Sequence, residues 1–454
     1  MLEVSAASYF GNPHPAVDCP KLFDSPFTFV YFTIAFHYFR LDFRMNITAQ
    51  WSSGSQEDWL SQLAQAQRAT RELLEREEGE QRRLGYFHTL REICQQPATW
   101  LRTAELMREH AADLGRLTHG LSCLTLSGSG SSEYAGDCVR PALRKNLGIN
   151  VQAVASGALL TLGVNAMPVG RPSLMVSLAR SGDSPESVGA LSLIRKLSPD
   201  VRHLILTCNR QGRLANESHA DPNVTVITLE DATNDRSLVM TSSFTNMALA
   251  GLFLGFLGDS VKYASVATAL ARGASKLLQT EIDALAQASR RPFRRVMFLG
   301  SGAHFPAARE ASLKMLEMTG GRVVTGCETY LGLRHGPMSS VHDDTLVVCF
   351  LSVDPMVRAY EADVVRELAR KRLGLFRILV GQEVPPNLPT SRDVVIPFTD
   401  TNLADEDLPI LDVVVGQLLA FFRCLHEGLR PDIPSENGVI HRVVQAFTLH
   451  LPRT

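Results

Sequence analysis

One stretch of the sequence, SLARSGDSPES at residues 177–187, brings four serines, a glycine and a proline together between two apolar segments. The preceding PSLMVSLA predicts a strand, and the following ESVGALSLIRKL is apolar at helical spacing. Ser184 therefore either caps a helix that begins at Pro185 or joins Ser181 and Gly182 in a cradle for an anion. A loop outside the carboxyl end of a parallel strand, followed by a helix N-terminus, suits a phosphate monoester. The residues alone leave both interpretations open.

A second turn, SGSGSS at residues 127–132, precedes another predicted helix. Gly128 and Gly130 match the start of a dinucleotide-binding fingerprint, but Glu133 occupies the position of its third glycine. A carboxylate there would crowd the helix and repel a pyrophosphate, which argues against a nucleotide and against a dehydrogenase. The turn is then either a plain connection or, through Gly130 and Ser132, a contact to a sugar held by the neighbouring phosphate site.

The segment PAAREASLKMLEM places three charged residues on one stripe of a helix. Because a helix turns by about 100° per residue, Glu310, Lys314 and Glu317 share a face with apolar neighbours. Such a stripe suggests a cleft in which a carboxylate transfers protons beside an ammonium group. The alternative is an exposed ion pair between Lys314 and Glu317.

The segment LGLRHGPMSS contains a histidine directly before a glycine and a proline. Proline halts regular structure and glycine permits close approach of a ligand, so we expect His335 to lie on a loop. An ordinary loop histidine is the alternative to a functional one.

These motifs lie in a chain whose strands and helices alternate from about residue 120, which predicts an α/β fold with a doubly wound parallel sheet. The pattern restarts with RRVMFLGSGAHFPAARE, where Gly300 and Gly302 stand as Gly128 and Gly130 stood before. The second copy has FLSVDPMVRAY instead of the serine-rich turn, so we expect one cradle in each chain. The predicted parts are an N-terminal tail (1–50), a helical region (51–110), a first domain (111–278) and a second domain with a C-terminal tail (279–454).

Composition narrows the possible functions. The 454 residues and 45% hydrophobic content allow two domains of ordinary size, and 45 basic against 47 acidic residues give no basic field for nucleic acid. Eight scattered cysteines without a Cys-x-x-Cys pair suggest reduced thiols in the cytoplasm and no metal site. The aromatic run SPFTFVYFTIAFHYF near the start is too short to cross a membrane and lacks the flanks of a signal peptide, so we expect a loose tail or a start-site artefact.

Several long, collinear motifs resemble one family. They are GSGSSEYAGD, LARSGDSPES, TNDRSLVMTSSFTNMA, REASLKMLEMTGG, LGLRHGPMSS and the C-terminal LLAFFRCLHEGLRPDIPSENGVIHRVVQAFTLH. From about Trp59 onward the chain is similar to proteins with two tandem sugar isomerase (SIS) domains, namely the galactosamine-6-phosphate deaminase/isomerases, also called tagatose-6-phosphate ketose/aldose isomerases. A more distant similarity is to the isomerase half of glucosamine-6-phosphate synthase.

The resemblance implies a role for each motif. Ser181 and Ser184, with nearby backbone N–H groups, would hold the phosphate, and Ser132 a sugar oxygen. Glu317 would be the base and His335 the residue that opens the sugar ring. In the synthase the corresponding histidine reaches into the neighbouring subunit, so the resemblance implies a homodimer or homotetramer with shared active sites.

Three departures concern the substrate and not the fold. Asp183 stands where related turns often have Asn, so its carboxylate must point away from a phosphate. Met338 follows HGP where the nearest relatives lead us to expect Lys. Ala179 lacks a hydroxyl that the synthase uses, and Arg180 is expected to supply positive charge instead.

The expected chemistry is the interconversion of an aldose and a ketose 6-phosphate. Glu317 would move the proton from C2 to C1, and Lys314 would stabilise the developing oxyanion. With galactosamine 6-phosphate the product of isomerisation is an imine that water hydrolyses to tagatose 6-phosphate and ammonia, without a metal or organic cofactor. The alternative function is a non-catalytic SIS protein that binds a sugar phosphate and regulates a partner. We expect no nucleic-acid or membrane partner in either case.

Overall fold

The computed structural model describes residues 55–218, 221–435, 438–445 and 447–450, all within the unit Ser55–Thr454. The expected N-terminal tail and the first residues of the helical region therefore lie outside the described residues. The described chain begins with six helices, the first of which starts at a capping box made by Ser55 and Asp58. They are α3 (Gln56–Ala66), α4 (Arg68–Leu74), α5 (Glu78–Leu84), α6 (Phe87–Cys94), α7 (Gln96–Glu109) and α8 (Ala111–Thr118).

The first sheet has five parallel strands in the order β2-β1-β3-β4-β5. Its strands are β1 (Cys123–Gly128), β2 (Asn150–Ala155), β3 (Ser173–Ala179), β4 (Arg202–Thr207) and β5 (Val224–Thr228). Both β1 and β3 are buried along their whole length, as expected where helices cover both faces of a sheet. The helices that follow these strands are α9 (Ser131–Leu147), α10 (Ser156–Leu162), α11 (Pro185–Leu197), α12 (Arg213–Asn216), α13 (Ser242–Leu252) and α14 (Ser260–Thr280).

The second sheet repeats this strand order, because β10-β9-β8-β6-β7 read from its other edge is second, first, third, fourth and fifth. Its strands are β6 (Arg295–Leu299), β7 (Val324–Glu328), β8 (Thr345–Phe350), β9 (Phe376–Gly381) and β10 (Val394–Pro397). Its helices are α15 (Ile282–Ser289), α16 (His304–Met318), α17 (Tyr330–Leu333), α18 (Pro355–Arg370) and α19 (Pro409–His426). The expected fold of two parallel α/β units flanked by helices is confirmed.

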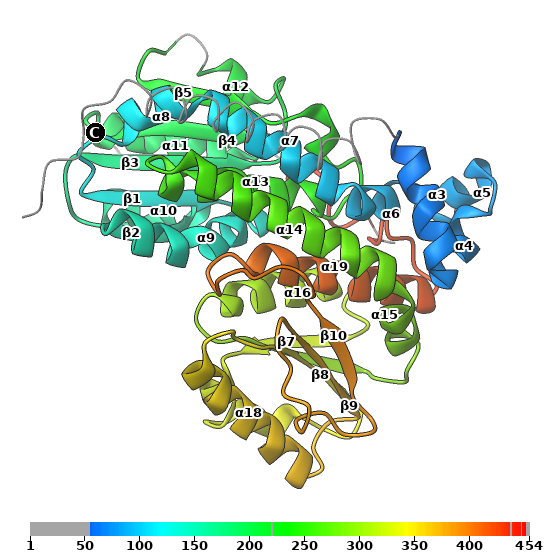
Figure 1. Cartoon of the computed structure of the whole chain (residues 1–454). Coiled ribbons are helices and arrows are strands. Elements are labelled where there is room, and N and C mark those ends of the chain that lie inside the picture. Colours follow the sequence, from blue (N-terminus) through cyan, green and yellow to red (C-terminus); the bar gives the residue numbers. More distant parts are fainter. Residues whose placement is uncertain (1–54, 219–220, 436–437, 446, 451–454) are drawn as a thin grey trace, which may run out of the picture. The chain divides into compact units, whose positions relative to one another are not determined.

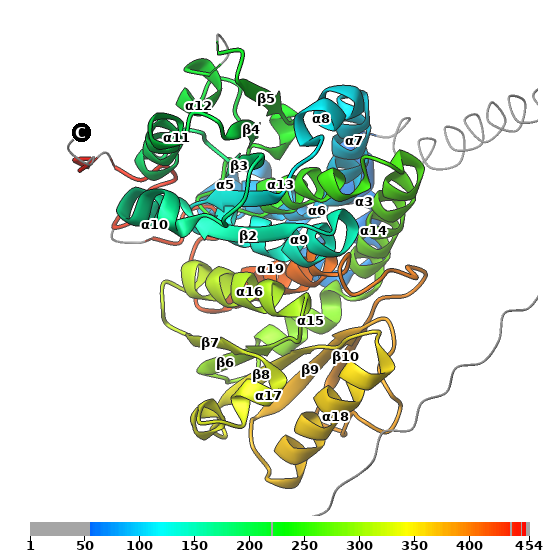
Figure 2. The ribbon, with the colours of Figure 1, turned by 90° about the vertical axis from the view of Figure 1, so that its left-hand side faces the viewer.

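Two helices of the second sheet, α16 and α19, lie between the two sheets (Figure 1). They cross so closely that a Cβ on Gly416 would lie 2.5 Å from the Cβ of Ala311, which requires glycine at that position. On its other side α16 packs against α9 of the first sheet. Figure 2 shows α16 facing α9, whereas α17 and α18 lie on the opposite face of the second sheet. Within the described chain α19 is also the one helix long and apolar enough to cross a membrane, but 89% of that segment is buried inside the fold, as in a core helix.

Candidate active site

The loop after β3 lies at the carboxyl edge of the first sheet and leads into α11. Gly182 has a φ of +71°, a conformation that favours glycine, and Pro185 is the first residue of the helix. The prediction that Ser184 caps α11 with its side chain is wrong. Its hydroxyl donates to Glu186 Oε2 at 2.8 Å, and the N-terminus of α11 has no side-chain cap. The N-terminus is thus left uncapped beside two serines, an arrangement that suits an anionic ligand.

This loop is held by the turn that follows β4 and by the start of α12. The Ser181 hydroxyl accepts the Asp183 N–H at 3.2 Å, and the Ser181 carbonyl accepts from Asn209 Nδ2 at 2.8 Å. The Asp183 carboxylate accepts the Arg213 N–H at the start of α12, at 3.0 Å. Its charge is therefore committed to α12, as the sequence required if a phosphate is to bind at α11.

Arg180 has different partners from those expected. It is 7% exposed, and its guanidinium donates to the carbonyls of Ser237, Leu238 and Arg442 at 3.2, 2.9 and 2.8 Å. Burial lowers the pKa of Arg180, although nearby Asp235 acts in the opposite direction. Its N–H groups thus connect two segments that form walls of the site, residues 234–243 and the C-terminal residues around Arg442. The sequence had instead predicted that Arg180 supplies positive charge to the phosphate.

One of these walls is the segment 234–243, from the motif TNDRSLVMTSSF. Glu92 of α6 accepts the N–H groups of Arg236 and Ser237, at 2.5 and 3.2 Å. Asp235 accepts those of Thr241 and Ser243, at 2.7 and 2.9 Å. Burial, and then the charge of Asp235, raise the pKa of Glu92 to about 8. The helical region before the first sheet thus positions one wall of the site.

The other wall is the C-terminal strap, which we define as residues 438–445 and 447–450. Arg442 donates to the carbonyl of Asp235 at 2.8 Å and to the side chain of Asn234. Leu449 packs so close to α11 that a Cβ on Gly189 would lie 2.9 Å from its Cδ1. The C-terminal strap therefore lies against α11 and against Arg180 of the loop that leads into it.

The turn after β1 lies beside the loop after β3, because the two strands are hydrogen-bonded neighbours. Gly130, with a φ of +58°, precedes α9, and Ser132 lies buried in the first turn of that helix. The Ser132 hydroxyl contacts Met240 Sδ at 3.9 Å, from the wall segment 234–243. Beneath the turns, three hydroxyls form a chain with spacings of 3.2 and 3.4 Å, contributed by Ser127, Ser156 and Ser187.

The charged stripe on α16 meets the same turn from the other side. Lys314 is fully buried, and its Nζ lies 2.5 Å from Glu317 Oε2, 3.0 Å from Ser131 Oγ and 3.4 Å from Glu310 Oε1. The alternative of an exposed ion pair is therefore wrong, because α9 and α19 cover this face of α16. Burial alone would lower the pKa of Lys314, but Glu310 and Glu317 outweigh that effect and raise it.

Glu317 differs from the other two residues of the stripe, because 26% of its side chain remains exposed. A carboxylate that is held by a buried ammonium and still open to solvent can exchange protons with a bound molecule. The fold thus brings the Ser131–Ser132 turn, Lys314 and Glu317 to the carboxyl edge of the first sheet, although α16 belongs to the second.

His335 lies elsewhere. It is exposed between α17 and a short 3-10 helix, Pro337–Ser340, and follows the carboxyl end of β7. Glu317 is near the far end of α16, about 20 Å along the helix from its start. Because α16 and α17 lie on opposite faces of the second sheet (Figure 2), one chain does not bring His335 to Glu317.

Sequence reasoning missed three contributors to this site. Ser131, which contacts Lys314, stands in the SGSGSS turn already singled out, so its position next to Ser132 was a usable signal. Met240 belongs to a quoted motif, but nothing in the motif indicates the residue that it contacts. Arg442 lies 262 residues from Arg180, and no local pattern predicts that pairing.

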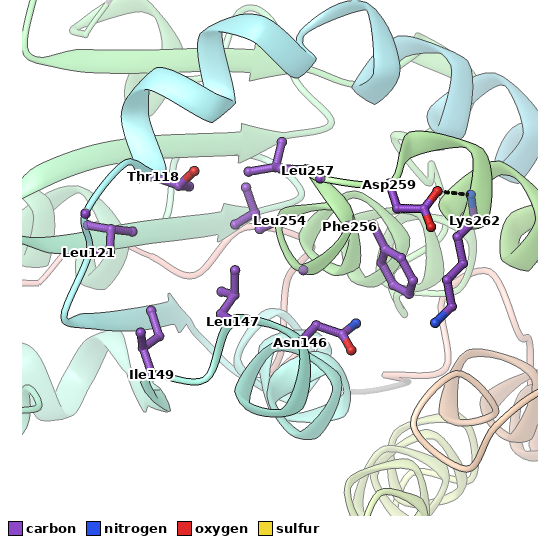
Figure 3. Close-up of a pocket in the computed structure, with 13 residues that line it drawn as sticks. Thr118, Leu121, Asn146, Leu147, Ile149, Leu254, Phe256, Leu257, Asp259 and Lys262 are labelled. Atoms are coloured by element: carbon purple, nitrogen blue, oxygen red, sulfur yellow. Dashed lines mark hydrogen bonds between the residues drawn. The ribbon is translucent and has the colours of Figure 1, made fainter. Parts of the chain in front are cut away.

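A hollow of about 490 Å³ lies at the other edge of the first sheet (Figure 3). Leu121 and Ile149, which precede β1 and β2, line it together with Phe256 and Lys262. Ligands of open α/β sheets bind at the carboxyl edge, so we assign the chemistry to the turns at that edge and not to this hollow. Within the described residues, no group of three His, Cys, Asp or Glu side chains is placed to hold a metal ion.

Comparison with known proteins finds relatives among sugar-phosphate deaminases and isomerases. No family model matches the sequence. The chain is 38% identical over 372 residues to the AgaS protein of Streptomyces coelicolor, covering 80% of this chain and 95% of that one. It is 33% identical over 375 residues to the D-galactosamine-6-phosphate deaminase AgaS of a Shewanella species, covering 81% and 92%. The crystal structure of tagatose-6-phosphate ketose/aldose isomerase from Escherichia coli matches with a TM-score of 0.70 and 30% identity, over 78% of this chain and 96% of that one.

Proposed function

Since this chain belongs to the D-galactosamine-6-phosphate deaminase family, we propose that it isomerises and deaminates galactosamine 6-phosphate. The observation that carries the proposal is the buried Lys314 paired with the partly exposed Glu317, at the carboxyl edge that also presents Ser132 and the uncapped α11. A base, a fixed positive charge and an anion-binding helix end are the groups that an aldose–ketose isomerisation of a phosphosugar requires.

We propose the following roles for the side chains. The N-terminus of α11, with Ser181, Gly182 and Ser184, binds the 6-phosphate, and Gly130 with Ser132 contacts the sugar. Arg180 acts indirectly, by holding the walls of the site. Glu317 takes the C2 proton of the open-chain amino sugar and returns it to C1. Lys314, beside the base, favours the negative charge that develops on O1.

The proposed reaction balances without a cofactor. Removal of the C2 proton gives an enolate that takes up a proton at O1 to become an enolamine. Protonation at C1 gives an iminium, which loses an N–H proton to become the 2-imine of a ketose, so the proton gained by O1 is balanced by the one lost from nitrogen. Water adds to C2 of the imine and the C–N bond breaks, which yields tagatose 6-phosphate and ammonia. The protein supplies the base, the electrostatic stabilisation and the orientation, while water is the only co-reactant.

The test is to incubate the purified protein with 6-phospho amino sugars and 6-phosphohexoses and to measure ketose and ammonia separately. We expect equal amounts of ketose and ammonia from galactosamine 6-phosphate. Ketose without ammonia from an amino sugar would contradict deamination. Binding of the phosphosugars without turnover would support the non-catalytic regulator instead.

We further propose a cytoplasmic homodimer or homotetramer in which His335 of one chain completes the site of its neighbour and opens the sugar ring. Two observations support it: His335 is exposed, and it lies away from Glu317 within its own chain. A mixture of the inactive Glu317→Gln and His335→Ala variants should then regain about a quarter of wild-type activity, because half of the dimers are hybrids and one of their two sites is intact. No regain after subunit exchange, confirmed by mass, would place His335 in its own chain's site or outside any site.

A further inference from the structure

Glu310 has no role in the reaction proposed above, yet its side chain is as fully buried as that of Lys314. Its side chain is fully buried one helical turn before Lys314, and its Oε1 lies 3.4 Å from the Lys314 Nζ. Among the described residues, Ser131 and Lys314 are the donors beside its carboxyl group, and neither makes a hydrogen bond of good geometry with it. A carboxyl group in that state is either ionised at a high cost or protonated.

The surroundings of Glu310 favour the protonated form. Lys314 is the cation in contact with it, but Lys314 lies closer to Glu317, at 2.5 Å. Other charges nearby are already paired, Asp137 of α9 with Arg309 at 2.8 Å and Asp412 of α19 with His304 at 2.6 Å. The remaining polar or titratable groups that face it from packed elements are Ser131 and Cys138, both on α9.

We propose that Glu310 is a positioning residue whose protonated form leaves the positive charge of Lys314 to Glu317 and to the reacting sugar. One buried ammonium cannot balance two carboxylates, so ionisation of Glu310 divides the charge of Lys314 between them. O1 of the reacting sugar then loses electrostatic support as negative charge develops on it. The inference rests on the proposed function, because it assigns Glu310 to the same site.

The pKa of Glu310 agrees with this geometry. Burial raises it to about 7, Lys314 opposes the rise, and Glu317 adds to it. Glu310 is therefore protonated below about pH 7 and ionised above it. The expected signature is a fall of kcat on the alkaline side of neutrality, which a carboxamide at the same position would remove.

The experiment measures kcat and KM between pH 5.5 and 9 for the wild type and for Glu310→Gln, with Glu361→Gln as control. Glu361 is also a fully buried glutamate in the second half of the chain, with Oε2 bonded to the Ser352 N–H at 2.8 Å, so its amide tests for a general effect of removing a buried acid. We expect kcat of the wild type and the control to fall by about tenfold in total between pH 6 and pH 9, while Glu310→Gln stays level and KM is little changed. A fall of kcat above pH 7 that persists in Glu310→Gln, or a wild-type kcat that does not fall, would overturn the proposal.

Infrared difference spectra separate this inference from the proposed function. Between pH 6 and pH 8.5, the wild type should lose a protonated-carboxyl band that is missing from Glu310→Gln and retained in Glu361→Gln. If the band behaves so but no phosphosugar is turned over, the proposed function fails while the protonation of Glu310 stands. If turnover is normal and the band is unchanged in Glu310→Gln, the inference on Glu310 fails alone. Should Glu310→Gln not fold, Glu310→Met provides a second neutral variant for both measurements.

Discussion

The carboxyl edges of the two sheets are built from the same strand order but are filled differently. After β3, the loop with Ser181 and Ser184 leaves the N-terminus of α11 without a cap. After β8, Asp354 closes the N-terminus of α18, since its Oδ1 accepts the N–H groups of Met356 and Val357 at 2.8 and 3.1 Å. The second helix therefore uses a carboxylate of its own chain where the first leaves its donors open.

Further carboxylates complete the closure of the second edge. Asp405 accepts the Val353 N–H at 2.7 Å, and Glu361 accepts the Ser352 N–H at 2.8 Å. His304 bridges Asp405 and Asp412 at 3.1 and 2.6 Å. Burial alone would lower the pKa of His304, but the two aspartates raise it to about 10. The comparison teaches that the architecture fixes where a ligand edge lies, whereas the residues decide whether it stays open or is satisfied internally.

The largest expected effect comes from Glu317, the proposed base at the carboxyl edge of the first sheet, which we call the open edge. The carboxyl edge of the second sheet, where Asp354 caps α18, is the closed edge. Glu317→Gln keeps the shape of the side chain but removes its proton acceptor, so exchange of the C2 proton with solvent should fall by about 10²-fold or more. The matched change at the closed edge, Glu361→Gln, should leave exchange near the wild-type rate at pH 6.5. NMR measurement of the C2 proton exchange rate distinguishes the two variants. An equal loss of exchange in Glu317→Gln and Glu361→Gln would contradict the assignment of the base to Glu317.

The next effect is on stability and belongs to the closed edge. His304→Leu leaves the buried Asp412 and the partly exposed Asp405 without their cation and should lower the free energy of unfolding by about 3–5 kcal/mol. The control is His203→Leu in β4, where both ring nitrogens lack partners and burial, with a smaller effect of Arg195, lowers the pKa to about 4. That control should change stability by no more than about 1 kcal/mol. Urea denaturation measures the free energy of unfolding of both variants. An equal loss of stability in His203→Leu and His304→Leu would contradict the prediction.

A smaller effect is expected from the loop that leaves α11 open. Replacing both Ser181 and Ser184 by Ala removes two hydroxyls from the proposed phosphate site, and KM should rise about 10- to 100-fold with the fold intact. Ser352→Ala, at the matching loop of the closed edge, should leave KM unchanged. Inorganic phosphate should compete with substrate in the wild type and much less in the double variant. An unchanged KM would mean that the two serines only shape the loop.

The last prediction is a pH dependence of stability that arises from His304. Its pKa is raised in the folded state, so its contribution is fully present below its ordinary value near 6.5 and is lost as the pH rises through about 10. The stability difference between wild type and His304→Leu should shrink above pH 6.5, by about 1.4 kcal/mol per pH unit at most. Urea titrations at pH 6, 7.5 and 9 measure it, and a constant difference would mean that His304 is neutral in the folded chain.

Local sequence patterns predicted much of this molecule because they reflect local physics. Apolar runs followed by glycine and serine turns specified parallel strands and the loops at their carboxyl ends, and helical spacing placed Glu310, Lys314 and Glu317 on one face. The same patterns did not reveal that this face is buried, since burial depends on α9 and α19, which are distant in the chain. They also assigned the cap of α11 to Ser184, whereas the neighbouring Glu186 takes that hydroxyl.

The sequence by itself determined two parallel α/β units, a serine-rich loop in only one of them, and the residue types that could bind a phosphate and move a proton. The tertiary structure alone decided that Lys314 contacts Ser131, that Arg180 connects segment 234–243 with the C-terminal strap, and that Glu310 is fully buried beside Lys314. It also placed His335 away from Glu317 within one chain. The physical reason is that propensity and periodicity act over a few residues, while burial, charge balance and pKa depend on side chains that only the packed fold brings together.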